Sequence, residues 1–305
     1  MWLAVAIAGY LLLAIVSVLD KFLVSTERLR PVMLAFYSTA PLVVIILLWP
    51  FGVRSLESAR DFWLAVVSGA AFVGALWTMY IGFDRGEVSH SGPLLGAALP
   101  LATLLIGAFW LRETITLPQL FGIQLLIIGS LIISLPSEGH HHGWARSGFW
   151  IIAAGFLFAL SNIAAKDLYD HYGFYSGFMW TRLLIGICGL ALWLSPAVRA
   201  SLASRPARHR TGRQWSSFKD VGIFAADKIG GVLGAILIQY AIAAGSVTIV
   251  NALSGVQYAF LILVVAGLSR FSPALFKEKY GRGEIKQELL AVAVIVAGLW
   301  LVVAR

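Results

Sequence analysis

Residues 12–21 read Leu-Leu-Ala-Ile-Val-Ser-Val-Leu-Asp-Lys, and residues 157–166 read Leu-Phe-Ala-Leu-Ser-Asn-Ile-Ala-Ala-Lys. Both stretches are apolar for most of their length, and both end on a lysine. A second similarity pairs residues 89–100 with residues 246–257, and these two stretches are slightly farther apart in the sequence than the first two. Each enters a long apolar run after a short glycine-containing turn. Self-similarity of this kind predicts two copies of one structural unit.

The composition predicts that this unit lies in a membrane. Of the 305 residues, 59% are apolar and 12% are charged, whereas a soluble domain carries about 25% charged residues. So few charges cannot cover a water-facing surface, but a lipid-facing surface needs none. We attribute the net charge of +8 to basic loops that set orientation and meet anionic lipid headgroups, and we do not expect a nucleic-acid partner.

Apolar runs long enough to cross a bilayer core, about 20 residues each, recur along the whole chain. We predict ten spans, at residues 2–24, 31–50, 61–83, 88–111, 117–135, 148–169, 173–195, 219–241, 246–270 and 285–303. The first is interpreted as a retained span, because no small-residue cleavage site follows it. Five spans then fall in a first repeat at 1–136 and five in a second at 148–305, with an inter-repeat loop at 137–147.

Repeats with an odd number of spans must sit in the membrane with opposite orientations. Inverted repeats are typical of secondary transporters, which bind substrate near the midplane between the repeats. We therefore expect an all-α, multi-pass protein of the cytoplasmic membrane, made of two inverted five-helix repeats. Its expected partners are a small-molecule substrate and membrane lipids; we expect no cofactor, and a monomer or homodimer.

Charged residues inside the spans are the main candidates for the substrate site. Inserting each such residue at the centre of a membrane helix costs about 2.5–3.5 kcal/mol of free energy, so several together need a compensating role. We expect Lys21, Lys166, Arg182 and Lys228 to line a hydrated cavity, with Asp227 as their partner or as a proton acceptor. Adjacent helical residues point about 100° apart, so Asp227 and Lys228 cannot both face one site. Snorkelling and structural ion pairs are the alternatives.

Aromatic and amide side chains within the spans are less specific candidates for substrate contacts. They are Trp77 and Tyr80 in the third span, Asn162 in the sixth, and Asn251, Gln257 and Tyr258 in the ninth. In bilayers, Trp and Tyr more often anchor the interface or pack between helices. Glycines spaced as Gly92 and Gly96 are interpreted as sites of close helix packing.

Motifs for enzymatic chemistry are missing from the sequence. It contains no Walker loop, HExxH or GxSxG, so we predict no catalytic residue and no enzyme. The alternative interpretation is a membrane-embedded transferase. Its one candidate site in the sequence is the cluster of Asp84, Glu87 and His90, which we interpret instead as the cap of a tight turn. The run at 140–142 is three histidines without Cys or carboxylate partners, which predicts a solvated loop and no metal site.

One segment resembles a known family. It comprises Pro100, the run Leu111-Arg112-Glu113-Thr114-Ile115-Thr116, Gln119, Gly122, and Gly129 followed by Leu131-Ile132-Ile133. This is similar to the motif that closes each repeat in the drug/metabolite transporter superfamily, EamA type: a Glu ending the fourth span and Gln-x2-Gly opening the fifth. Arg182 also stands where family members often carry Arg. The second repeat departs from the motif, since Gln257 replaces the Pro and Glu278 follows only after an insertion.

The resemblance implies ten spans in two inverted repeats and a carrier that works by alternating access, often an exporter. The spans hold four cations against three acids, Asp20, Asp167 and Asp227, which favours a small polar substrate with an anionic group. A flippase for a phosphate-bearing lipid or lipid-linked headgroup, and an exporter of cationic or amphipathic compounds, remain alternatives. Basic residues concentrate in the odd-numbered loops and place both termini outside, whereas the resemblance implies termini in the cytoplasm. Substrate identity, direction and coupling ion stay open.

Overall fold

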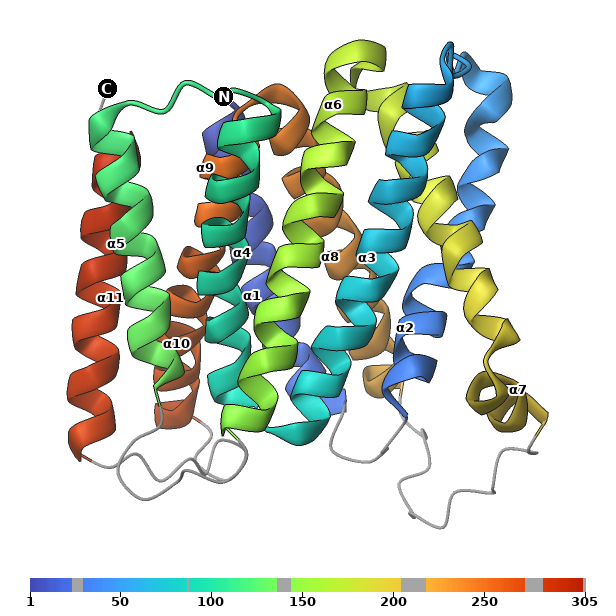
Figure 1. Cartoon of the computed structure of the whole chain (residues 1–305). Coiled ribbons are helices and arrows are strands. Elements are labelled where there is room, and N and C mark those ends of the chain that lie inside the picture. Colours follow the sequence, from blue (N-terminus) through green and yellow to red (C-terminus); the bar gives the residue numbers. More distant parts are fainter. Residues whose placement is uncertain (24–29, 87, 136–143, 204–217, 272–281, 304–305) are drawn as a thin grey trace.

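The described residues form a bundle of long helices that run roughly parallel and antiparallel to one another (Figure 1). The computed structural model describes residues 1–23, 30–86, 88–135, 144–203, 218–271 and 282–303, and no strand occurs in these ranges. The helices are α1 Trp2–Leu23, α2 Pro31–Thr39, η1 Ala40–Phe51, α3 Ala59–Arg85, α4 Val88–Trp110, α5 Leu117–Ser134, α6 Trp144–Ala191, η2 Leu192–Leu194, α7 Pro196–Ala203, α8 Phe218–Ala244, α9 Val247–Ala252, α10 Ser254–Phe271 and α11 Arg282–Val303.

Seven helical segments in the described ranges are long and apolar enough to cross a membrane. They are Pro31–Phe51, Ala59–Arg85, His90–Trp110, Leu117–Ser134, Arg146–Leu194, Val247–Val264 and Lys286–Val303, and two shorter apolar helices are Trp2–Ser17 and Ile229–Ala244. Large apolar side chains on the outside, such as Phe109 at 87% exposed and Trp300 at 68%, suit lipid as solvent. The chain is an all-helical, multi-pass membrane protein.

The 48-residue helix α6 consists of two arms that meet at Gly173. Gly173 has φ 72° and ψ 169°, a conformation that glycine adopts without the penalty other residues meet. Figure 1 shows the first arm rising, the chain turning over, and the second arm descending beside it. Gly177 then allows the second arm to approach the first, because a Cβ there would lie 2.6 Å from Cδ1 of Tyr169. The break separates the predicted spans 148–169 and 173–195.

The predicted span at 31–50 changes helix type part of the way along. It is α-helical to Thr39 and then continues as the 3₁₀ helix η1 to Phe51. Pro41 and Pro50 lack the amide protons that a regular α-helix would use, and a 3₁₀ segment of twelve residues is long for its type. Gly189 of α6 lies directly against the backbone of Ala40, where a Cβ would meet the amide nitrogen at 2.8 Å.

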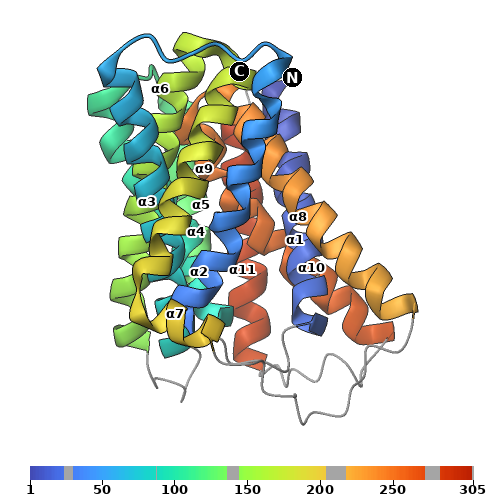
Figure 2. The same cartoon turned by 90° about the vertical axis from the view of Figure 1, so that its right-hand side faces the viewer.

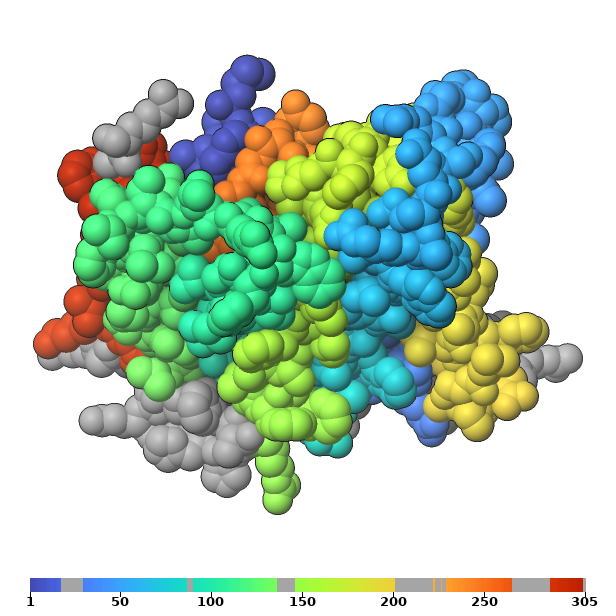
Figure 3. Space-filling view, turned by 45° about the horizontal axis from the view of Figure 1, so that its top comes forward, coloured from blue at the N-terminus to red at the C-terminus, as the bar shows by residue number. Residues whose placement is uncertain are grey.

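Both chain termini lie at one end of the bundle, which we call the terminal face (Figure 1). The connections from η1 to α3, from α4 to α5 and from α8 to α9, and the turn at Gly173, lie at this face. The helix ends that flank the long connections between α1 and α2, α5 and α6, α7 and α8, and α10 and α11 lie at the opposite end. Figure 3 shows the terminal face brought forward in space-filling form.

Two helix pairs join the halves of the chain through glycines that face each other. A Cβ on Gly122 of α5 would lie 2.8 Å from the carbonyl oxygen of Gly298 of α11, and one on Gly298 would lie 2.9 Å from that of Gly122. Gly9 of α1 and Gly234 of α8 stand in the same relation, at 3.2 and 3.3 Å. Without side chains between them, the two backbones of each pair come into direct contact.

Candidate functional site

A chain of hydrogen bonds between buried polar side chains runs across the bundle from α4 to α8. Asn251 of α9 donates from Nδ2 to Thr103 Oγ1 at 2.9 Å and accepts at Oδ1 from Asn162 Nδ2 of α6 at 3.1 Å. Gln239 of α8 donates from Nε2 to Asn162 Oδ1 at 3.3 Å and accepts at Oε1 from the Tyr169 hydroxyl at 2.8 Å. All five residues are at most 8% exposed.

This series of hydrogen bonds brings together two residues that the sequence predicts as substrate contacts, Asn162 and Asn251. Each bonds the other, so their amides satisfy part of their hydrogen-bonding capacity within the protein, as buried polar groups must. Tyr169, Gln239 and Thr103 were not among the predicted site residues. Gln239 had a sequence signal, because an amide inside an apolar span needs a partner from another helix.

Arg182, predicted as a cavity cation, lies on the second arm of α6 and is 8% exposed. Its guanidinium carbon lies 5.3 Å from the ring centre of Phe72 and 5.1 Å from that of Phe178. Its Nε has no hydrogen-bond partner, and among the described residues no acidic group lies within ion-pair distance of its guanidinium.

The surroundings of Arg182 compensate its charge only in part. A cation against aromatic faces gains about 0.5–2 kcal/mol per contact. The cost of taking an ion out of water is several kcal/mol, so two ring contacts leave a deficit. The planar guanidinium offers five donors in a fork that matches a carboxylate or phosphate. The arrangement is therefore suited to receiving an anion from outside the protein.

Lys166 lies toward the terminal face, where α6 meets the end of α8. Its Nζ donates to Asp170 Oδ1 at 2.7 Å and to the carbonyl oxygen of Ala243 at 3.1 Å. The Lys166 side chain is 13% exposed and that of Asp170 is 50% exposed. This cation is thus paired and close to water, in contrast to Arg182.

Tyr80, Trp77 and Gln257 are three more predicted site residues, and two of them have hydrogen-bond partners within the protein. The Tyr80 hydroxyl shares a hydrogen bond of 3.3 Å with Ser38 of α2, and Trp77 is 41% exposed. Gln257 of α10 donates to Ser17 Oγ of α1 at 3.5 Å.

The ring of Tyr258 lies against Gly92 and Gly96 of α4. A Cβ on Gly96 would lie 2.5 Å from its Cε2, and one on Gly92 would lie 3.1 Å from its Cε1. The two glycines therefore form a slot for an aromatic ring between α4 and α10, and the close contact is with a side chain of α10 and not with its backbone.

Several predicted residues lie outside the described part of the structure. These are the side chains of Lys21, Asp227 and Lys228, together with Glu87, the histidines at 140–142 and Glu278. In the described ranges, no group of three or more His, Cys, Asp or Glu side chains is arranged to hold a metal ion.

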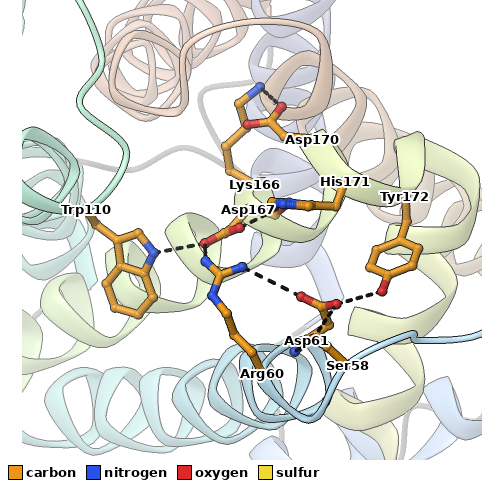
Figure 4. Close-up of polar contacts among 9 residues, drawn as sticks. All are labelled: Ser58, Arg60, Asp61, Trp110, Lys166, Asp167, Asp170, His171 and Tyr172. Atoms are coloured by element: carbon orange, nitrogen blue, oxygen red, sulfur yellow. Dashed lines mark hydrogen bonds and ion pairs between the residues drawn. The ribbon is translucent and has the colours of Figure 1, made fainter.

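A carboxylate cluster joins α3, α4 and α6 at the terminal face (Figure 4). Asp167 Oδ2 accepts hydrogen bonds from Arg60 Nη2 at 2.7 Å and from Trp110 Nε1 at 3.1 Å. His171 Nδ1 lies 3.3 Å from the other Asp167 oxygen. The Asp167 side chain is 8% exposed and that of Arg60 is 57% exposed, so the pair lies at the boundary between protein and water. Asp61, the neighbour of Arg60, accepts from the Tyr172 hydroxyl at 2.7 Å.

The segment that carries the family motif makes a second connection between the halves. Arg112 has a left-handed φ of 51° and directs the chain so that Glu113 faces the start of α9. The Glu113 carboxylate accepts from Ser246 Oγ at 2.7 Å and from the amides of Val247 and Thr248 at 2.8 and 3.3 Å. An anion at this position satisfies free helix donors and complements the helix dipole.

Two more motif residues have structural partners. Gln119 accepts from the backbone amide of Thr116 at the start of α5, at 3.1 Å. Gly122 provides the close contact with α11 described above. Glu113, Gln119 and Gly122 of the motif thus each fix a helix start or a helix contact.

Comparison with known proteins gives a family match for the first half of the chain. Residues 1–135 match the model of the EamA-like transporter family. An uncharacterised protein of Methanocaldococcus jannaschii is 34% identical over 71 residues, which are 23% of this chain and 51% of that protein. A protein of Streptantibioticus cattleyicolor named as a probable terminal-alkyne amino-acid exporter is 28% identical over 138 residues, 44% of each chain. The matches thus span about half the length of these curated relatives.

One solved crystal structure, described only as that of a protein, shares the fold along nearly the whole chain. It covers 99% of this chain and 95% of its own, with a TM-score of 0.64 and 15% sequence identity. At this identity the likeness concerns the fold alone.

Proposed function

We propose, from the match of residues 1–135 to the model of the EamA-like transporter family, that the chain is a secondary active transporter. It carries a small polar metabolite with an anionic group across the cytoplasmic membrane by alternating access. The helical, multi-pass structure supports this proposal, and the two inverted five-helix repeats, at 1–136 and 148–305, are part of it.

The helix order supports ten passages. The two arms of α6 count separately because the chain turns at Gly173, and the shorter apolar helices of α1 and α8 complete the set. An even number of passages agrees with both termini lying at one end of the bundle (Figure 1). The first repeat then ends with α5 and the second with α11.

The proposal that the substrate is anionic rests on the buried Arg182. It is 8% exposed, lies against two aromatic rings, and has an Nε without a partner. An anionic substrate would supply the missing counter-charge, with hydrogen bonds of the strong, charge-assisted kind. Lys21, Lys166 and Lys228, with Asp227, remain proposed members of the site, as do Asn162, Trp77, Tyr80, Asn251, Gln257 and Tyr258.

The named relative supports a carboxylate as the anionic group. Its name gives it an amino acid as substrate, and every amino acid carries a carboxylate. A carboxylate with an apolar body would suit a guanidinium set between Phe72 and Phe178, since the rings can contact the body while the guanidinium edge binds the oxygens.

Thermal stability of the purified protein against a panel of compounds tests the proposal. A ligand that binds only the folded protein stabilises it by RT ln(1 + [L]/Kd), so weak substrates register at millimolar concentration. We expect carboxylates or phosphate esters to raise the melting temperature, and Arg182→Gln or Lys228→Ala to reduce the shift.

Arg85→Gln is the matched control for Arg182→Gln. Arg85 also lies over an aromatic ring, 4.9 Å from the centre of Trp150, but it is exposed; its replacement should leave the ligand shift unchanged. Stabilisation by cationic or amphipathic amines alone would contradict the anion proposal and favour the cation exporter. Stabilisation by phospholipid headgroups alone would favour the flippase.

A further inference from the structure

We propose that the contact between α6 and α8 is a gate, closed in this conformation, on the terminal-face side of the transport path, and that α1 and α8 open it by moving as one unit. The inference rests on the proposed function in assuming a path beside these helices. Its central residue is Gln239, which is not among the predicted site residues.

The described side-chain contacts between α6 and α8 lie near one end of α8. Gln239 bonds Tyr169 and Asn162, Tyr240 packs edge-on against Phe174 with ring centres 5.3 Å apart, and the carbonyl oxygen of Ala243 accepts from Lys166. All of these α8 residues belong to its last turns before Ala244. Figure 2 shows that α8 and α2 diverge toward the other end of the bundle.

The rest of α8, as far as its side chains are described, packs on α1. A Cβ on Gly230 would lie 2.9 Å from Val16, and one on Gly234 would lie 2.8 Å from Leu13. With the reciprocal contact of Gly9 and Gly234, the two helices fit too closely to slide past each other. A packed pair of this kind shifts as a body and does not deform gradually.

The structure also provides a fixed point beside the moving pair. The chain passes from α8 to α9 at Gly245 and Ser246, and the start of α9 is held by Glu113 from the first half. α9 and its Asn251 stay bonded to Thr103 of α4. An outward shift of the terminal-face end of α8 with α1, taken up by the backbone at Gly245, would separate Gln239 from Asn162 and Tyr169 while leaving α9 in place.

The chemistry of Gln239 suits a contact that opens and closes. Its amide accepts from Tyr169 on one side and donates to Asn162 on the other. Water admitted by opening can replace both bonds, because water also donates and accepts. The closed and open arrangements can therefore be close in free energy, as a two-state element requires.

The test uses a cysteine reporter and needs no substrate. Cys188 is replaced by Ser, and Phe178→Cys places one thiol beside Arg182. A membrane-impermeant thiol reagent is applied to vesicles at the terminal face or at the opposite face. We expect Gln239→Leu to raise the labelling rate from the terminal face about tenfold, since loss of one or two buried hydrogen bonds shifts a two-state equilibrium by that order.

Ser254→Ala is the matched control for the lost hydrogen bonds. Ser254 bonds the carbonyl oxygens of Gly96 and Asn251, so its replacement removes buried bonds that do not join α6 to α8, and labelling should not change. Tyr169→Phe removes a single hydroxyl from the gate and should give a smaller rise than Gln239→Leu.

A second variant tests the moving unit. Leu13→Cys with Gly234→Cys allows a bridge between α1 and α8, formed before labelling, and the rise caused by Gln239→Leu should persist. Loss of the rise on bridging would contradict movement as one unit. An equal rise from both faces, or no rise in a variant that keeps the parent's melting temperature, would overturn the gate. Because no substrate is added, these outcomes do not depend on whether an anion binds at Arg182.

Discussion

The carboxylate of Glu113 accepts a hydrogen bond of 2.8 Å from the backbone amide of Val247, although the two residues belong to opposite halves of the chain. Glu113 follows the fourth predicted span, and Val247 begins α9. The free amides at the start of α9 thus receive their acceptor from the other half. The family motif is therefore understandable as a structural connection rather than as a substrate contact.

Replacing Glu113 by Gln should destabilise the protein by about 1–2 kcal/mol, because the amide keeps one acceptor but loses the charge that complements the helix start. Thermal unfolding in detergent measures the change. Glu57→Gln is the control: its side chain is 71% exposed and pairs only with Arg54, so it should shift the melting temperature little. Equal shifts for the two variants would refute the role given to Glu113.

Arg60 and Asp167 should show measurable coupling in a double-mutant cycle. The Asp167 side chain is 8% exposed and bonds Arg60 at 2.7 Å, but the exposed guanidinium is screened by water, so we expect about 0.5–1.5 kcal/mol. The substitutions are Arg60→Gln and Asp167→Asn, with unfolding as the readout. Arg54 and Glu57 form a pair at the same end of the bundle with side chains 61% and 71% exposed; their coupling should be close to zero.

Gly69→Ala should destabilise the protein by more than about 2 kcal/mol. A Cβ there would lie 2.7 Å from the carbonyl carbon and 2.8 Å from the carbonyl oxygen of Leu184, and backbone of a packed helix cannot move aside cheaply. Gly222→Ala, also in a helix, has nothing within 4 Å and should be neutral or stabilising by about 0.5–1 kcal/mol. Comparable losses for both would contradict the proposed packing of α3 on α6.

Thr103→Val should cost about 1–3 kcal/mol, because Asn251 Nδ2 loses its acceptor inside the bundle. Thr78→Val makes the same change of side chain at a residue whose hydroxyl bonds only carbonyls of its own helix, Gly74 and Ala75. The difference between the two melting temperatures isolates the bond to Asn251. No difference would mean that the chain of buried amides contributes little to stability.

The helices were predictable because the bilayer sets their length. Seven long apolar helical segments lie where apolar runs predicted spans, and the break at Gly173 is at the first residue of the predicted span 173–195. The change from α2 to η1 was not predictable in the same way. Pro41 marks a weak point of the α-helix in the sequence, but the 3₁₀ segment also packs its backbone at Ala40 and Val43 against glycines of α6, and local sequence does not show that contact.

The candidate site was predictable residue by residue but not as an arrangement. Inside a membrane every polar side chain needs a partner, so Asn162 and Asn251 stood out; that they bond each other depends on the packing of α6 against α9. Gln239 and Tyr169 were missed for the same reason. The burial of Arg182 follows from its depth in a span, and Phe178 lies one turn before it on the same helix, but the contact with Phe72 depends on the packing of α3 against α6.

The reciprocal contact of Gly122 with Gly298 has an evolutionary consequence. Each glycine leaves room for the other's carbonyl oxygen, so a side chain gained at either position would push the two helices apart. The two copies of a duplicated unit can drift apart wherever each packs on itself, but not at the seam where they meet. If the two halves are such copies, as we propose, this contact would preserve their shared architecture while most of their shared residues were lost, and the faint match of residues 12–21 with 157–166 would be what remains.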